Sequence, residues 1–386
     1  MTEESRVERT SITITFREKA AFQDTYGGPT GVVTLQCMGI RPLRDSDTVL
    51  ITMHPSADTA NLPVMRQFAE AGVHVLAADS RYRGADYALI MEKVALDLGA
   101  VVRYAREQMG YKNVVLLGWS GGGSLSAFYQ AQAEHPTVSH TPSGDGPSLV
   151  DAGLTPANGV IQMAAHVSRH RLLTEWLDAS ILDENDPDKR DPSFDLYGDV
   201  VKPPFDEAFL GRYREAQIAR NRRITAWVKK KLAELRATGR ENQEFAFVTH
   251  GTMADPRWLD PAVDPNDRKA GWCYLGDPKI VNMSPVGLGR FSTLRSWLSQ
   301  WSYDYANADG PTSLAKVAVP VLVISNAADD ACPPSQAWRL FDAVGHNDKE
   351  HYEIKGATHY YFDQRELGAE AVEVVKRWLS KHGFEA

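Results

Sequence analysis

The residue with the clearest chemical potential in this sequence is Ser120, which lies in a G-x-S-x-G pattern, Gly118-Trp119-Ser120-Gly121-Gly122. The apolar run 114–117 before it has no polar alternation, as expected of a strand covered on both faces, and residues 124–131 after it can form a helix. A reversal this sharp crowds the backbone, so Gly118 and Gly122 would relieve the crowding by lacking side chains. The Ser120 hydroxyl would then stand at a helix N-terminus, where N–H groups favour developing negative charge. The alternative is a glycine-rich turn whose serine only caps the helix.

A serine nucleophile needs an imidazole that takes and returns its proton and a carboxylate that orients the imidazole. Asp329 follows the apolar run 318–325, and His359 follows a further strand and precedes the last helix. Among the eleven histidines, His359 alone has this strand-loop-helix setting. Asp330 stays open as the acid, with Asp329 then capping the next helix. The sequence therefore predicts an acyl-transfer triad in the chain order Ser120, Asp329, His359.

These segments together resemble the α/β-hydrolase family. Residues 118–123 resemble its nucleophile elbow, and Gly356-Ala357-Thr358-His359 resembles its G-x-x-H loop. Asn326-Ala327-Ala328-Asp329, with Pro333, resembles its G-x-x-D-x-x-x-P pattern, with asparagine in place of the glycine. The resemblance covers about residues 10–165 and 310–386. It implies an α/β fold with a mostly parallel central sheet flanked by helices, a mainly helical cap, and the activity of a serine hydrolase.

The same resemblance implies an oxyanion hole made of two backbone N–H groups. Gly121, directly after the nucleophile, should supply one of them. The second should come from the loop after the third strand, which here reads His54-Pro55-Ser56-Ala57 in place of the family's His-Gly. Proline has no N–H, so Ser56 is the candidate donor. Trp119, beside the nucleophile, and His54, at the strand end, are candidate substrate contacts.

The remaining core must bring these side chains to one edge of a sheet. Alternating strands and helices indicate a parallel sheet with crossovers on both faces, whose strand carboxyl ends line the ligand site. His54, Ser56, Arg81 and Ser120 all follow such ends, where Arg81 would be either a polar anchor or half of a structural ion pair. The expected strands are 11–16 and 31–38, as antiparallel partners, then 48–53, 73–78, 114–117, 159–165, 318–325 and 350–354. The expected helices include 87–108, 124–131, 336–344 and 367–380, and one with Leu62, Met65, Phe68 and Ala69 on one face.

The pattern breaks down between residues 168 and 309, where polar loops separate short helical pieces. This region resembles the cap of the α/β hydrolases, which predicts a core of residues 1–167 and 310–386 with the cap inserted at 168–309. Its best-defined helix runs from about 206 to 238 and carries a basic run that we interpret as a solvated face rather than a membrane or anionic-substrate contact: Arg220, Arg222, Arg223, Lys229, Lys230 and Lys231. Its aromatic residues could line a pocket, but for most of them a place in the core is favoured: Trp272, Trp297, Trp301, Tyr303 and Tyr305.

Length and composition fit this reading. With 386 residues, 43% of them apolar, the chain can build one large core with an insertion, or two domains. A net charge of −8 argues against nucleic acid or an anionic membrane surface as the main partner. Cys37, Cys273 and Cys332 are odd in number and widely spaced, which predicts buried, reduced thiols. The charged start, residues 1–6, lacks the apolar segment of a secretion signal and no run is long enough to span a membrane, so a cytoplasmic location is expected.

The predicted function is hydrolysis of a carboxylic ester or related acyl bond through an acyl-enzyme on Ser120. The expected partner is a small-molecule acyl substrate, and a homodimer is left open. No glycine-rich phosphate loop or metal-ligand cluster occurs, so no cofactor or metal is expected. A carbon-carbon bond hydrolase acting on a diketone or ring-cleavage product is the nearer alternative, and a non-catalytic small-molecule receptor is the more distant one. Serine rather than aspartate at position 120 argues against haloalkane dehalogenases and epoxide hydrolases.

Overall fold

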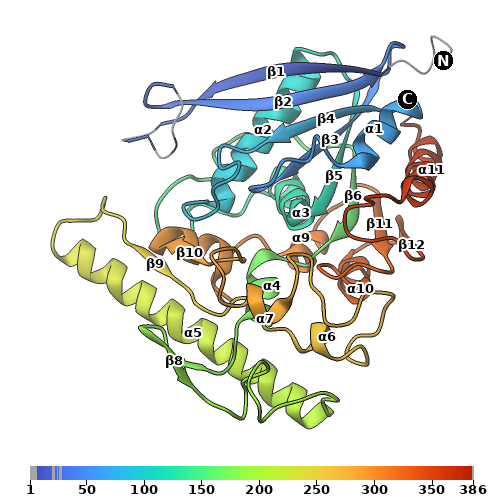
Figure 1. Cartoon of the computed structure of the whole chain (residues 1–386). Coiled ribbons are helices and arrows are strands. Elements are labelled where there is room, and N and C mark those ends of the chain that lie inside the picture. The colour runs from blue at the N-terminus through green and yellow to red at the C-terminus, as the bar shows by residue number, and fades with distance from the viewer. Residues whose placement is uncertain (1–6, 20–21, 24, 26–27, 385–386) are drawn as a thin grey trace.

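The computed structural model describes residues 7–19, 22–23, 25 and 28–384, and its described part is built on an eight-stranded sheet in the order β1-β2-β4-β3-β5-β6-β11-β12. The strands are β1 (Val7–Arg17), β2 (Val32–Pro42), β3 (Thr48–His54), β4 (His74–Asp79), β5 (Asn113–Ser120), β6 (Gly159–Ala165), β11 (Val321–Asn326) and β12 (Lys349–Ile354). Strand β2 runs antiparallel to both of its neighbours, β1 and β4. The six strands that follow β2 in this order, β4, β3, β5, β6, β11 and β12, are parallel to one another (Figure 1). The prediction of a mostly parallel α/β sheet opened by an antiparallel pair is confirmed. Residues 1–6, on which the reasoning about a secretion signal rests, lie outside the described residues.

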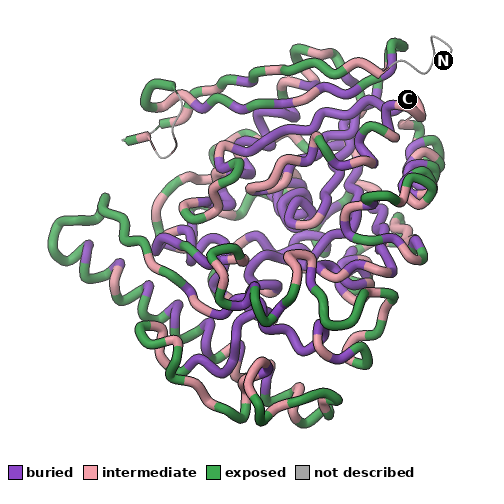
Figure 2. The backbone as a smooth tube through the Cα atoms, viewed as in Figure 1, coloured by how far each residue is buried: buried purple, intermediate pink, exposed green. Residues whose placement is uncertain are grey.

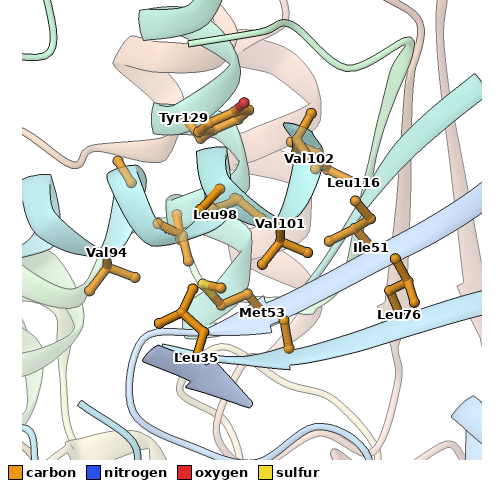
Figure 3. Packing of buried hydrophobic residues seen from close by; sticks show 14 of the residues in the cluster. Leu35, Ile51, Met53, Leu76, Val94, Leu98, Val101, Val102, Leu116 and Tyr129 are labelled. Carbon is orange, nitrogen blue, oxygen red and sulfur yellow. The ribbon is translucent and has the colours of Figure 1, made fainter. Parts of the chain in front are cut away.

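Helices cover both faces of the sheet, as the alternation of strands and helices requires. Their bounds are α1 (Pro63–Glu70), α2 (Met91–Glu107), α3 (Gly121–Glu134), α9 (Gly310–Leu314), α10 (Pro334–Ala343) and α11 (Arg365–Lys381). Helices α2 and α3 pack on one face, where Leu98 and Tyr129 share a hydrophobic cluster with Ile51 and Leu116 of the strands (Figure 3). On the other face α1 and α11 pack against neighbouring strand positions such as Leu50 and Val115. Successive strand residues thus point into the two cores on opposite faces of the sheet, and the central strands β3, β5 and β6 are buried except at strand ends such as His54 and Ser120 (Figure 2).

The chain between β6 and α9 adds no strand to the central sheet and packs around its own apolar clusters. It contains α4 (Arg169–Trp176), β7 (Ile181–Asp183), β8 (Asp186–Arg190), α5 (Glu207–Ala237), β9 (Ala246–Val248), α6 (Pro256–Leu259), α7 (Pro278–Val281), β10 (Phe291–Thr293), α8 (Leu294–Ser296) and the π-helical turn η2 (Trp297–Trp301). We call this part of the chain, residues 168–309, the insertion. None of the described helices combines the length and the apolar character needed to cross a membrane.

The long helix α5 has the predicted extent, because Asp206 caps its N-terminus by accepting from Phe209 N and Thr238 ends it. The interpretation of its basic run as a solvated face is wrong for Arg220, which is 1% exposed. This guanidinium pairs with Glu184 at 2.7 Å and donates to three backbone carbonyls, so it holds the strands β7 and β8 and the loop at 250–251 against the helix.

The aromatic residues of the insertion divide between core and surface. Trp297 and Trp301 are fully buried in the cluster under α5, as favoured from the sequence. Trp272 and Tyr305 are exposed and form cation-π contacts with Lys269 and Lys229. Trp297 and Trp301 therefore belong to the core of the insertion, whereas Trp272 and Tyr305 lie on its surface.

Candidate active site

Ser120 ends strand β5 in strained backbone geometry, with φ 53° and ψ −121°. A non-glycine residue is found there only when its surroundings impose the conformation, and such strain is concentrated at functional sites. Its hydroxyl makes no capping hydrogen bond to helix α3, which begins at Gly121. The geometry therefore favours the strained elbow over the alternative of a simple N-cap, and Ser120 remains partly exposed at the carboxyl end of the sheet.

The glycines around Ser120 are required by close backbone contacts. A Cβ on Gly118 would lie 2.6 Å from both Gly122 O and Gly123 Cα, and a Cβ on Gly122 would lie 2.5 Å from Met53 O. Backbone atoms cannot move aside as a side-chain end can. The sequence-based explanation of Gly118 and Gly122 is thus supported by the packing of α3 against β3 and β5.

Replacing Gly118 by alanine is expected to destabilise the protein by about 1 to 3 kcal/mol or more, because the new methyl group overlaps backbone atoms of the elbow. Gly211→Ala is the matched control. Gly211 lies within α5, is exposed and has open space where a Cβ would be, so this change should be neutral or stabilise by about 0.5 to 1 kcal/mol. Urea unfolding of both variants measures the difference, and equal stabilities would contradict the packing argument.

Asp329 and His359 form a buried pair at the same edge of the sheet. His359 Nδ1 lies 2.7 Å from Asp329 Oδ2, and the two side chains are 3% and 0% exposed. The other carboxylate oxygen of Asp329 accepts from the backbone N–H groups of Ala331 at 2.8 Å and Cys332 at 2.6 Å. Asp329, rather than Asp330, therefore contacts the imidazole. The pKa of Asp330 is raised to about 6, first by burial and then by the neighbouring Asp329 carboxylate.

The loops that carry these two residues are tied together by Asn326, the position at which the sequence departs from the family pattern. Asn326 Nδ2 donates to Thr358 O at 2.8 Å, and Tyr361 donates its hydroxyl to Asn326 Oδ1. An asparagine at the end of β11 thus links the acid loop to the histidine loop. Sequence reasoning treated Asn326 only as a departure and missed this role, which depends on a contact 32 residues away along the chain.

Trp119 holds the other side of the histidine loop. Its indole is 4% exposed, donates from Nε1 to His359 O at 3.1 Å and packs with its ring centroid 4.7 Å from that of the His359 ring. This placement supports a positioning role for Trp119, whereas the predicted substrate contact would need a more accessible ring.

The thiol of Cys332 lies close to the Asp329–His359 pair and to the Ser120 side chain. The pKa of the Cys332 thiol is raised well above its usual value, chiefly by burial and next by the Asp329 carboxylate, while a hydrogen bond with the Ser120 side chain opposes the rise. A hydrogen bond between Ser120 and His359 is absent from the described structure. Catalytic contacts of this kind often tighten only when substrate binds.

The described residues contain one group with the spacing to hold a metal ion, in which the ligand atoms of Asp329, Cys332 and His359 all lie within 4.8 Å of one another. Two of these atoms already bond to each other in the 2.7 Å contact between Asp329 and His359. The donor set is therefore better accounted for by the acid–imidazole pair. All three cysteines are free and buried, as predicted.

The insertion contacts the acid loop directly. Trp258 donates its indole N–H to Asp330 O at 2.9 Å, and Asn266 donates to Asp329 O at 2.8 Å. Ser299 and Asn307 donate to the fully buried carboxylate of Glu92 on α2, at 2.7 and 2.9 Å. Buried and partly buried hydrogen bonds thus fasten the insertion to the core at the acid loop and at α2.

The loop after β3 differs from expectation. The N–H groups of Ser56 and Ala57 donate to His54 Nδ1 at 3.1 and 2.8 Å, so the N–H predicted to serve the oxyanion hole has another partner in this conformation. His54, the predicted substrate contact, is a partly exposed residue at the end of β3. A Cβ on Gly121 would lie only 2.6 Å from His54 Nε2, so the imidazole lies beside the elbow.

Arg81 is half of a structural ion pair and not an anchor for substrate. Its side chain is 1% exposed and bonds to Asp97 at 2.8 Å and Glu18 at 2.7 Å. A buried cation satisfied by two carboxylates is not available to a ligand.

Sequence reasoning missed two further polar residues near the elbow, His166 and Arg169. His166 follows β6 and is 3% exposed, and its pKa is lowered to about 3 by burial and by the Arg169 charge. Arg169 lies 3.3 Å from Asp86 and stacks 4.3 Å over the Trp301 ring. The position of His166 directly after a predicted strand was the signal that could have identified it.

Comparisons with known proteins place the chain among distant relatives. No family model matches it. An uncharacterized 31.7 kDa protein encoded in the traX-finO intergenic region of Escherichia coli is 37% identical over 70 residues, which are 18% of this chain and 24% of that protein. The match therefore spans about a quarter of the length of this curated relative.

Solved structures match over nearly the whole chain. The α/β hydrolase GrgF from Penicillium sp. sh18 has a TM-score of 0.53 at 13% identity, covering 97% of this chain and 99% of that chain. Est1E from Butyrivibrio proteoclasticus has a TM-score of 0.47 at 14% identity, covering 96% of this chain and 99% of that chain. A monoacylglycerol lipase from Paleococcus ferrophilus has a TM-score of 0.44 at 17% identity, covering 87% and 94%.

Proposed function

We propose that this chain, which has the α/β-hydrolase fold, is a serine hydrolase that cleaves a carboxylic ester or related acyl bond through an acyl-enzyme on Ser120. The observation that carries the proposal is the buried contact of 2.7 Å between Asp329 and His359 at the strand edge where Ser120 stands in strained geometry. A carboxylate that orients an imidazole beside a strained serine is the arrangement that activates a hydroxyl group for acyl transfer.

Each residue then has a defined task. Ser120 Oγ attacks the carbonyl carbon, and His359 takes its proton and later gives it to the leaving group. Asp329 fixes Nδ1–H of His359, which leaves Nε2 as the base. The Gly121 N–H, at the start of α3, stabilises the negative charge on the carbonyl oxygen. Water attacks the acyl-enzyme in the second half of the reaction, with His359 again acting as base.

The way the insertion is attached to the core supports the proposal of a small, partly hydrophobic substrate. Its contacts with the acid loop and with Glu92 make it a fixed cover, because opening it would leave buried polar groups without partners. Substrate must then fit between cover and core.

A substrate panel tests this reading of the insertion as a cap over Ser120. We expect hydrolysis of p-nitrophenyl acetate or butyrate, small aromatic esters and tributyrin to exceed that of olive-oil emulsion by at least about tenfold, because a fixed cap excludes long chains and gives no interfacial activation. Initial rates below and above the solubility limit of tributyrin measure this. Preference for the emulsion, with a jump in rate at the interface, would identify a mobile lipase lid.

The same panel addresses the hydrolase assignment itself. Lactones, thioesters and a vinylogous diketone are included, so that turnover of the diketone alone would redirect the assignment to carbon-carbon bond hydrolysis. An absence of turnover on all of them, with no labelling of Ser120 by a fluorophosphonate, would favour a receptor.

A further inference from the structure

The first three residues of the loop after β3, Pro55 to Ala57, have no free backbone N–H to serve as a second oxyanion donor in this conformation. Pro55 has no N–H. The N–H groups of Ser56 and Ala57 both donate to His54 Nδ1, at 3.1 and 2.8 Å. The hole predicted from the sequence therefore lacks one backbone donor, and the loop turns its N–H groups toward an imidazole.

These two contacts fix the tautomer of His54. A ring nitrogen that accepts backbone N–H groups carries no proton, so in the neutral imidazole the proton lies on Nε2. Because both donors are backbone groups, the tautomer does not depend on the rotamer of any neighbouring side chain. His54 thus presents a fixed N–H donor on the side of the ring opposite the loop.

That donor lies beside the elbow. A Cβ on Gly121 would be 2.6 Å from His54 Nε2. Nε2 therefore lies next to Gly121, the residue whose N–H is the first oxyanion donor. The rest of β3 is buried, whereas His54 is partly exposed at the strand end where the ligand site lies.

The surroundings keep this imidazole neutral. Burial lowers the pKa of His54 well below its usual value, and the positive field of Arg169, with smaller contributions from His166 and His359, lowers it further. These groups face it from α4, from the end of β6 and from the histidine loop. The Arg169 charge is partly balanced by Asp86 at 3.3 Å.

We propose that His54 Nε2–H is the second donor of the oxyanion hole, paired with the Gly121 N–H; this rests on the proposed acyl chemistry of Ser120. When Ser120 Oγ bonds to the carbonyl carbon, the π electrons move to the carbonyl oxygen and the serine proton passes to His359. His54 keeps its own proton and hydrogen-bonds to the oxyanion. The electrons return as the leaving group departs with the proton from His359.

His166 is the rival donor, since its Nε2 would lie 3.3 Å from a Cβ on Gly121. Its Nδ1 has no hydrogen-bond partner in the described structure, so nothing there fixes the proton on Nε2. His54 has the fixed tautomer and the greater access to the site, and His166→Asn serves as the comparison.

A pair of substitutions separates the two nitrogens of His54. Asparagine places its amide near the Nδ1 position and can still accept from the loop, but it has no donor at Nε2. Glutamine places its amide near the Nε2 position and can donate there. We expect His54→Asn to lower kcat by about 10²- to 10³-fold with little change in KM, and His54→Gln to restore at least tenfold of that loss.

The outcomes distinguish this proposal from the proposed function. If wild-type protein turns over esters and Ser120 takes a fluorophosphonate label, but His54→Asn keeps the wild-type kcat or His166→Asn shows the large loss, the role of His54 is overturned alone. If wild-type Ser120 takes no label and no ester is turned over, both fall. Nitrogen NMR of histidine-labelled wild-type protein gives the tautomer without any variant, and an Nδ1–H form of His54 would overturn the proposal even if the substitutions prevent folding.

Discussion

Ser120→Ala is expected to lower kcat/KM for the best ester by about 10⁴-fold or more, with unchanged stability, because the variant lacks the atom that forms the acyl bond. The residual rate would come from binding and oxyanion stabilisation alone. A fluorophosphonate should modify wild-type Ser120 by displacement of fluoride, and mass spectrometry of the peptide that contains residues 114–130 should show the adduct.

Ser126→Ala is the matched control for this change. Ser126 lies on α3, which begins directly after Ser120, is buried at 2% exposure and donates to Gly122 O at 2.7 Å. It should keep its label and most of its activity. Turnover that survives in Ser120→Ala, or an adduct on another residue, would refute the nucleophile assignment.

The parts of the fold that sequence patterns predicted are those set by local burial. Strand β6 has the bounds 159–165 expected from its mostly apolar run, and α5 begins after Asp206 and ends before Thr238, the residues that cap it. The candidate triad could be located because each of its members follows a strand, and parallel strands present their carboxyl ends at one edge. Chain order and the positions of strand ends were therefore enough to identify Ser120, Asp329 and His359 as candidates without knowledge of any contact.

Contacts between distant segments could not be predicted in this way. The helix expected over 87–108 begins only at Met91, because the insertion uses the preceding backbone: Thr293 N donates to Tyr87 O, and Gln300 donates to Asp86 O. The burial of Arg220 and the link made by Asn326 likewise depend on partners more than 30 residues away. A basic residue on a helix and an asparagine at a strand end have the same local appearance whether such partners exist or not.

Asp329→Asn is expected to lower kcat by about 10³- to 10⁴-fold while Ser120 and the fold stay in place. The carboxylate accepts Nδ1–H of His359 at 2.7 Å, so the imidazole keeps an unprotonated Nε2 for the serine proton. An asparagine can turn its NH₂ group toward Nδ1, because its carbonyl oxygen is held by the Ala331 and Cys332 N–H groups that now bond to Asp329 Oδ1. The ring must then carry its proton on Nε2, where it blocks general-base catalysis. Fluorophosphonate labelling of Ser120 should slow in parallel.

Asp330→Asn provides the control, since Asp330 was the alternative acid and differs by one position. Its raised pKa, to about 6, means that the folded state favours the protonated carboxyl, so this group's contribution to stability is lost as the pH rises from about 4 through 6. A neutral asparagine removes that loss, and Asp330→Asn should be at least as stable as wild type at pH 7, with kcat within a few-fold. Steady-state kinetics and thermal unfolding of both variants decide the assignment. If Asp330→Asn shows the large loss and Asp329→Asn does not, Asp330 is the triad acid, and the 2.7 Å contact between Asp329 and His359 has a structural role only.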